Sequence, residues 1–140
     1  MFTEAQQRFI ERHRVARLAT AGGDGAPHAI PICFAFDGER FFTPIDEKPK
    51  RVGPSGLRRV RNIRENQLAA IVIDDYSDDW TKLAYVLVRG RAEVVDGGPA
   101  HELALRLLRE RYPQYRTMVL EDLPVLVITP ERVASWGAVV

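Results

Sequence analysis

Seven basic side chains are concentrated in residues 48–64, a stretch that contains no acidic residue. They are Lys48, Lys50, Arg51, Arg58, Arg59, Arg61 and Arg64. Apolar residues at helical spacing, Leu57 and Ile63 among them, predict a short helix within this stretch. Backbone amides at a helix start and nearby cations bind phosphates and carboxylates, and a bound anion relieves the conflict between those cations and the helix dipole. The stretch therefore predicts a local anion site, with a solvated cationic surface as the alternative.

The sequence shows no set of side chains spaced like the catalytic groups of an enzyme that works without a cofactor. His13, His28 and His101 are far apart and show no metal-ligand spacing. His28 stands beside a turn and could approach a site, whereas His13 and His101 fall on predicted helices and are expected to be exposed. Ser55 lies outside any Gly-x-Ser-x-Gly motif, and Cys33 is expected to be a small packed side chain. If the protein is an enzyme, its chemistry is expected to come from a cofactor, and no metal site is predicted.

An acidic connection follows, with four aspartates between residues 74 and 79. It lacks the alternating ligands, central glycine and terminal glutamate of a calcium loop. We interpret it as an acidic turn, or as a surface that meets the basic stretch of another subunit. Three large aromatic side chains, Trp80, Tyr85 and Trp136, are expected in the core, although they also suit the walls of a site for a planar ring.

The overall composition restricts the class of protein. The chain has 140 residues, a formal net charge of +1 and 46% hydrophobic residues, which suits one domain over residues 1–140. The near-neutral charge argues against a general binder of nucleic acid or anionic membranes. There is one cysteine, no basic-then-apolar leader, and no apolar run near the roughly 20 residues of a membrane helix. The protein is therefore expected to be soluble and cytoplasmic.

Short strands at hairpin spacing dominate the chain. Six or seven strands are predicted, over residues 15–20, 28–36, 40–45, 68–73, 82–95, 125–129 and 132–136. Three short helices are predicted, beginning at a capping box of Thr3 and Gln6, at Ser55 or Gly56, and at Pro99. The nearly all-apolar run 68–73 indicates burial on both faces, and Gly90 indicates a bend. The pattern predicts a mainly β (α+β) antiparallel barrel with peripheral helices, not a doubly wound parallel sheet.

Seven segments spread over nearly the whole chain form a familiar pattern. They are Ala16–Thr20, Gly25–Phe34, Phe42–Lys50, Leu57–Ile63, Asp78–Trp80, Val88–Ala92 and Arg111–Tyr115. The most specific parts are Asp-Glu-Lys-Pro-Lys at residues 46–50 and Asp-Asp-Trp at residues 78–80. In these segments the chain resembles the pyridoxamine 5'-phosphate oxidase-like superfamily, and within it the branch of deazaflavin (coenzyme F420)-dependent oxidoreductases. The resemblance implies an antiparallel split β-barrel of six to seven strands, of the FMN-binding type.

The resemblance also implies a homodimer with two cofactor sites at the subunit interface. One strand runs along the tricyclic ring, a second strand end lies beside it, basic residues hold the phosphate, and the segment after the acidic turn arrives from the other subunit. On this sequence these are Pro31, Ile32, Cys33 and Phe34; Phe42, Thr43 and Ile45; Lys48, Lys50, Arg58 and Arg59; and Trp80 to Tyr85. The catalytic residues stay unassigned, and in our hypothesis water or substrate supplies the proton.

The identity of the cofactor stays open from the residues. Deazaflavin carries a phosphodiester and a glutamate tail, whereas FMN carries one compact phosphate, so seven cations favour deazaflavin. An FMN-dependent oxidase or reductase, or a non-catalytic protein that binds flavin, deazaflavin or haem, is the alternative. The chain has no C-terminal arginine motif for pyridoxamine phosphate, and its basic stretch lacks the interleaved aromatics of a nucleic-acid surface. The expected function is hydride transfer between reduced coenzyme F420 and a small organic substrate.

Overall fold

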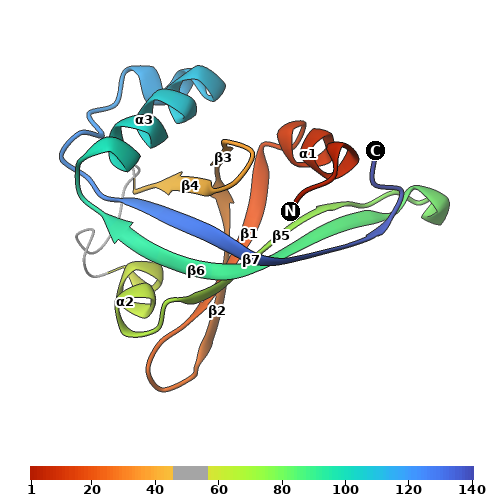
Figure 1. Cartoon of the computed structure of the whole chain (residues 1–140), viewed down its shortest axis with the longest axis horizontal. Helices are drawn as coiled ribbons and strands as arrows, with labels where there is room; N and C mark the ends of the chain where they lie inside the picture. Colours follow the sequence, from red (N-terminus) through yellow and green to blue (C-terminus); the bar gives the residue numbers. More distant parts are fainter. Residues whose placement is uncertain (46–56) are drawn as a thin grey trace.

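One antiparallel sheet forms the body of the protein, with strand order β2-β1-β5-β6-β7-β4-β3 (Figure 1). The computed structural model describes residues 1–45 and 57–140. Its strands are β1 (Val15–Ala21), β2 (Pro27–Cys33), β3 (Ala35–Phe36), β4 (Phe41–Pro44), β5 (Leu68–Asp75), β6 (Ala84–Val95) and β7 (Val125–Gly137). Its helices are α1 (Glu4–Glu11), α2 (Arg58–Glu65), α3 (Pro99–Arg111), η2 (Trp80–Lys82) and η3 (Pro113–Arg116). The predicted mainly β, antiparallel α+β fold is confirmed.

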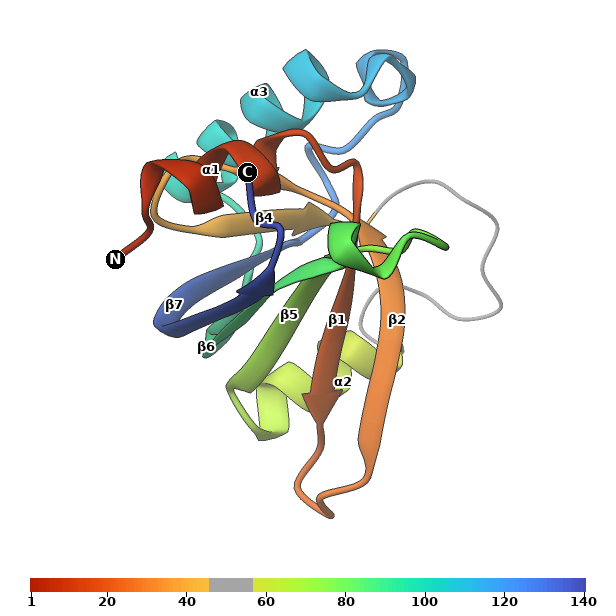
Figure 2. The same ribbon diagram turned by 90° about the vertical axis from the view of Figure 1, so that its right-hand side faces the viewer.

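The two edge strands of this sheet are consecutive in the chain. Only Phe34 separates β2, at one edge, from β3, at the other. Because one residue spans at most about 3.6 Å, the sheet has to roll until its edges meet, and it forms a half-barrel that is split between β2 and β4 (Figure 2). The sequence predicts one strand over residues 28–36. The structure breaks it at Phe34, because the first part pairs with β1 and the last part with β4.

A tyrosine hydroxyl holds this junction together. The backbone N–H of Phe34 donates to the hydroxyl of Tyr112 at 3.0 Å. The same hydroxyl lies 2.9 Å from the carbonyl oxygen of Phe34 and 2.7 Å from that of Arg14, and it can donate to one of them. The buried phenol of Tyr112 therefore satisfies backbone groups at a point where the chain passes from one sheet edge to the other.

Replacing Tyr112 with phenylalanine is expected to destabilise the protein while the core stays filled. The ring remains, but buried backbone groups of Phe34 lose their partner, at a cost of about 1–3 kcal/mol. Urea unfolding of the wild type and Tyr112→Phe measures the difference, with Tyr76→Phe as the control because Tyr76 is exposed. Equal unfolding free energies in all three proteins would show that the junction does not depend on the hydroxyl.

The last strand departs from the sequence prediction. The sequence predicts two strands around a turn at Pro130, whereas the structure has one continuous strand, β7, paired along β6. The pairing register shifts between Arg89 and Gly90, with Pro130 opposite Gly90. Pro130 has no N–H to give to the ladder. The register shift accommodates Pro130 without ending β7. It lies at Gly90, where the sequence predicts a bend.

The helices cover the sheet through two hydrophobic clusters. α1 and α2 pack into the cluster that fills the half-barrel, and α3 packs against β4 and β7 in the second cluster. The helical residues buried there are Phe9, Ile10, Val60, Ile63, Ala104, Leu105 and Leu108. The capping box of Thr3 and Gln6 and the helix start at Pro99 are confirmed. No helix in the described ranges is long and apolar enough to cross a membrane.

The expected exposure of His13 and His101 is wrong. His101 is buried on α3, and its Nε2 atom lies 2.8 Å from the carbonyl oxygen of Leu123. His13 follows the end of α1 and lies between the carbonyl oxygen of Phe9 and the carboxylate of Asp75, at 2.6 Å from each. His101 bonds Leu123 and His13 bonds Asp75, and both partners are distant in the sequence. Helical periodicity therefore does not reveal these contacts.

On the face of the sheet opposite the half-barrel cluster, the part not covered by the α3 cluster is exposed and carries apolar side chains beside charged ones, Arg17, Asp74 and Arg89 among them. β5 buries every second residue, Ala69, Ile71 and Ile73, while Leu68 on its other face is 54% exposed. The predicted burial of residues 68–73 on both faces is therefore wrong for one copy of the chain. Val15, Tyr85 and Trp136 are exposed on this same outer face of the neighbouring strands.

Candidate functional site

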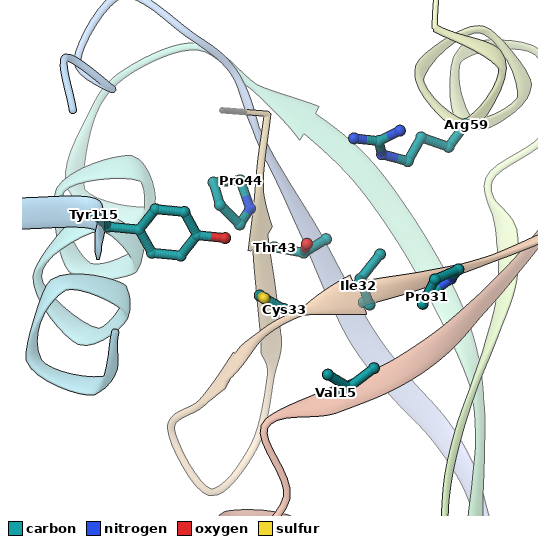
Figure 3. Close-up of a pocket in the computed structure, with 8 residues that line it drawn as sticks. All are labelled: Val15, Pro31, Ile32, Cys33, Thr43, Pro44, Arg59 and Tyr115. Atoms are coloured by element: carbon teal, nitrogen blue, oxygen red, sulfur yellow. The ribbon is translucent and has the colours of Figure 1, made fainter. Parts of the chain in front are cut away.

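A hollow of about 220 Å³ opens at the split in the half-barrel, between β2 and β4 (Figure 3). Its lining consists of Val15, Pro31, Ile32, Cys33, Thr43, Pro44, Arg59 and Tyr115. These residues come from β1, β2, β4, α2 and η3, which are widely separated in the sequence. The hollow therefore exists only because the sheet curls and brings its edges together.

β2 supplies one wall of the hollow and three of the predicted contact residues, Pro31, Ile32 and Cys33. It is an edge strand that pairs only with β1 among the described strands. Backbone groups on its other side can therefore bond a ligand, although Pro31 has no N–H and offers only its carbonyl oxygen. A wall with apolar side chains and an open backbone edge suits a planar heterocycle.

Three other predicted contact residues lie behind the hollow. The side chains of Phe34, Phe42 and Ile45 are at most 1% exposed and belong to the core clusters. The backbone of Phe34 is also occupied by Tyr112. Thr43 is the predicted residue of β4 that lines the hollow. The three buried side chains therefore support the walls from within the core.

The start of α2 brings positive charge to the hollow. Arg59 lines it, and its guanidinium is directed toward the space in front of β4 (Figure 3). The pKa of His28 is lowered, first by burial and then by the charges of Arg58 and Arg59. The Nδ1 atom of His28 is buried and has no hydrogen bond to a described residue. Since the first turn of α2 carries no acidic residue and its N-cap Leu57 no side-chain cap, the helix start adds to the positive potential.

The other basic residues of the 48–64 stretch are placed differently or lie outside the described residues. Arg61 and Arg64 are exposed on α2 and do not line the hollow. Lys48, Lys50 and Arg51 fall outside the described ranges. The described chain stops at Ile45, directly after a lining residue, and resumes at Leu57, two residues before Arg59.

Tyr115 is a lining residue that sequence reasoning misses. Its ring enters from η3, opposite Arg59, and its hydroxyl oxygen points toward Thr43, Pro44 and Cys33 (Figure 3). η3 follows α3, far along the sequence from β2 and β4, so spacing carries no signal for it. The one available hint is that Tyr115 ends the Arg111–Tyr115 segment of the resemblance.

Trp80, in η2, and Tyr85, at the start of β6, do not line the hollow. Trp80 is 72% and Trp136 54% exposed, and Tyr85 stacks on Trp136 with ring centroids 6.1 Å apart. The expectation that these three aromatics lie in the core is therefore wrong.

An arginine fastens the loop that carries Tyr115. Arg109 on α3 donates to the carbonyl oxygens of Tyr115 at 3.1 Å and Met118 at 2.9 Å, and its two Nη atoms bond the carboxylate of Glu121 at 2.6 and 3.0 Å. The hydrogen bond from Arg109 is the largest cause that lowers the pKa of Glu121 to about 2. The pair ties both ends of the 115–121 segment to α3.

The stability that depends on Glu121 is expected to disappear in acid. The pKa of its carboxyl group is below the ordinary 4.5 in the folded protein, so folding favours the ionised form. The contribution is therefore fully present above about pH 4.5 and is lost as the pH falls toward 2. Melting temperatures of the wild type and Glu121→Gln between pH 7 and pH 2 test this. The wild type should melt higher at pH 7, and a gap that persists near pH 2 would contradict the assignment.

Solved structures with the same architecture come from proteins of several kinds. A conserved hypothetical protein from Mycobacterium tuberculosis has a TM-score of 0.77 at 24% identity, covering 98% of this chain and 86% of that one. The haem storage protein HutZ from Vibrio cholerae has a TM-score of 0.73 at 17% identity, covering 98% and 95%. An F420 reductase has a TM-score of 0.67 at 24% identity, covering 95% and 98%. These similarities establish the fold.

Sequence comparison identifies the family of the chain as well as its fold. A 5a,11a-dehydrotetracycline/5a,11a-dehydrooxytetracycline reductase from Streptomyces rimosus is 29% identical over 137 residues, which cover 97% of this chain and 83% of that protein. The profile of the family described as pyridoxamine 5'-phosphate oxidase matches residues 2–137. Because this match spans nearly the whole chain, including every described wall of the hollow, the protein belongs to the pyridoxamine 5'-phosphate oxidase family.

Proposed function

We propose that this family member is a reductase that uses reduced deazaflavin, coenzyme F420, to transfer a hydride to a small organic molecule. The observation that carries the proposal is the cationic start of α2 beside an apolar hollow with an open strand edge. A cofactor with a planar ring and a phosphate needs both features side by side. The Streptomyces rimosus relative is a reductase, which supports this class of reaction.

In this proposal each part of the site has a separate task. The cofactor supplies the hydride when it is bound. β2 and β4 hold the ring, the basic residues hold the phosphate and the tail, and the buried aromatic and aliphatic side chains keep the walls rigid. The residues are Pro31, Ile32, Cys33 and Thr43 for the ring; Arg58, Arg59, Lys48 and Lys50 for the anion; and Phe34, Phe42 and Ile45 behind the walls. The charges of Arg58 and Arg59 lower the pKa of His28 after burial does, but His28 itself does not line the hollow.

A second copy of the chain completes the site in this proposal. At about 220 Å³ the hollow is smaller than the roughly 300–1,000 Å³ of ordinary ligand pockets. Val15, Pro31 and Cys33 belong both to the hollow and to the outer face of the sheet, which is exposed and carries apolar side chains such as Leu68 and Trp136 beside charged ones. A homodimer formed through this face would bring Trp80 to Tyr85 of one copy toward the hollow of the other. Sedimentation velocity of the purified protein tests the dimer.

FMN is the second candidate, and one observation favours it. On α2 only Arg59 lines the hollow, which suits a single phosphate. A flavin would use the same walls and the same helix start. The proposed site suits either cofactor. The two cofactors differ in how many basic side chains they need beyond the first turn of α2.

Parallel binding titrations with coenzyme F420 and FMN test the proposed function. The protein is expected to bind deazaflavin more tightly than FMN, and the preference should shrink at high salt because the glutamate tail adds charged contacts. Tight FMN binding without deazaflavin binding would select the second candidate. Binding of haem alone, with no turnover of any acceptor, would contradict both.

A further inference from the structure

A buried amide ties α2 to the first hairpin of the sheet. Asn62 on α2 is 2% exposed, and its Nδ2 atom donates to the hydroxyl oxygen of Thr20 at 3.1 Å. Thr20 is also buried and belongs to the inner face of β1, beside which α2 lies (Figure 2). An amide and a hydroxyl are costly to bury unless they are hydrogen-bonded. This contact therefore favours one position of α2 on β1.

A second contact joins the end of α2 to the turn between β1 and β2. The backbone N–H of Gly23 donates to Oε1 of Glu65 at 2.9 Å. The turn approaches the helix most closely at Gly22, where a Cβ atom would lie 2.9 Å from Oδ1 of Asn62 and 3.1 Å from Oε1 of Glu65. At Gly23 a Cβ atom would lie 3.4 Å from Oε1 of Glu65, an ordinary van der Waals distance. The fit between hairpin and helix is therefore tight at Gly22 and relaxed at Gly23.

Both hydrogen bonds belong to the second half of α2, whereas the proposed anion site is at its start. The N-cap Leu57 provides no side-chain cap for the first turn. Apolar packing alone is non-directional, but the hydrogen bonds of Asn62 and Glu65 have preferred distances and angles. They therefore fix the position of the helix along its axis and its rotation about that axis.

β1 transmits this position to the wall of the hollow. Thr20 pairs with His28, and Arg17 pairs with Pro31 in the same uninterrupted antiparallel register. Pro31 is one of the three residues through which β2 lines the hollow. The hydrogen bond at Thr20 therefore connects the helix whose start faces the hollow with the strand that forms one of its walls.

We propose that Asn62 and Glu65 are positioning residues that set the distance between the anion-binding start of α2 and the ring-binding wall on β2. The inference rests on the proposed function for the nature of the ligand. Neither side chain lines the hollow, so each acts through the hairpin, by way of Thr20 and Gly23. The consequence is that ring and phosphate of one cofactor are held together only while α2 keeps its place on β1.

Two pairs of ligands test this role. FMN is compared with riboflavin, and coenzyme F420 with its deazaflavin core that lacks the phosphate and the tail, because each pair shares the ring and differs in the anion. A displaced α2 is expected to weaken binding of the phosphate-bearing ligand by about two- to tenfold, as for one hydrogen bond, and to leave the phosphate-free ligand unaffected. A merely structural role would weaken both ligands of a pair equally.

Two sites in the hairpin supply the variants, each with a matched control. Thr20→Val removes the acceptor of Asn62 and keeps the shape, whereas Thr20→Ser keeps the hydroxyl and is expected to retain the wild-type ratio of affinities. Gly22→Ala pushes the turn away from Asn62 and Glu65, and Gly23→Ala is its control because the Cβ atom fits there. All dissociation constants are measured by equilibrium titration well below the melting temperature of each variant. Gly22→Ala also keeps the test decisive if Thr20→Val does not fold.

The outcomes separate this inference from the proposed function. If Thr20→Val and Gly22→Ala bind every ligand like the wild type, or lose affinity equally for both ligands of a pair, the positioning role is wrong and the site stands. If the wild type binds FMN and not coenzyme F420, the proposed cofactor is wrong and the positioning role is decided on FMN and riboflavin. If the wild type shows no preference for a phosphate-bearing ligand, both proposals are wrong.

Discussion

Replacing Arg59 with glutamine is expected to weaken binding of the deazaflavin coenzyme by about tenfold to a hundredfold. Arg59 is the side chain of α2 that lines the hollow, and a charge-assisted hydrogen bond contributes about 1.5–3 kcal/mol. Such a loss corresponds to this change in the dissociation constant. Glutamine keeps a long polar side chain but has no charge to set against a phosphate.

The same helix supplies the matched control. Arg64→Gln removes one positive charge from the exposed part of α2, away from the hollow, so its effect should be limited to weak, salt-screened attraction. Fluorescence titration at physiological salt measures both dissociation constants, and the melting temperatures without cofactor show that each variant folds. Similar losses in Arg59→Gln and Arg64→Gln would mean that a diffuse cationic surface binds the cofactor, not a defined contact.

Replacing Gly90 with alanine is expected to lower the free energy of unfolding by at least about 2 kcal/mol. A Cβ atom at this position would lie 2.1 Å from the carbonyl oxygen of Thr129 and 2.9 Å from the Cα atom of Pro130. Both neighbours are backbone atoms of β7, so no side chain can rotate away. The two longest strands would have to separate at the point where their register shifts.

Gly97→Ala is the control for this change. Gly97 follows the end of β6, and a Cβ atom there meets no other atom within 4 Å. Its effect on stability should be small, since the open site removes the steric cost. Urea unfolding of the two variants and the wild type compares them directly. If Gly90→Ala is as stable as Gly97→Ala, the close approach of the two strands is not maintained in solution.

Local patterns in the sequence predict the elements well where the cause is local. The capping box at Thr3 and the proline at the first turn of α3 act on backbone groups within a few residues, and the structure confirms both. The hairpin signal at Gly38 is confirmed by its positive φ of 97° between β3 and β4. The alternation along β1 similarly matches a strand with one buried face.

Burial is predicted less well, because it depends on what packs against a side chain from elsewhere in the chain. Trp136 and Tyr85 are apolar enough for the core, yet they stack on the outer face of the sheet. His101 is polar enough for the surface, yet it is buried because the carbonyl oxygen of Leu123 accepts its hydrogen bond. In each case the partner lies far away in the sequence, and a periodic pattern on one element cannot identify it.

The candidate site is likewise predicted only in part from the sequence. The acid-free basic run of residues 48–64 is visible in the sequence, and so is the resemblance that points to Pro31, Ile32, Cys33 and Thr43. The sequence alone does not separate Arg59, which lines the hollow, from Arg61 and Arg64 on the same helix. It also gives no sign that Phe42 and Ile45 lie behind the wall, and for Tyr115 at the opposite end it offers only the end of a resemblance segment.

The sequence by itself therefore determined a mainly antiparallel β fold, a family and a concentration of cations. These follow from properties that act over a few residues: alternation of side chains, helix caps, turn residues and charge. Only the tertiary structure decided where the cations meet an apolar hollow. That hollow forms because Phe34 alone joins the two edges of one sheet, which forces the sheet to curl and brings β2, β4, α2 and η3 to one place. Closure of this kind is a property of the whole sheet and is not carried by any single segment.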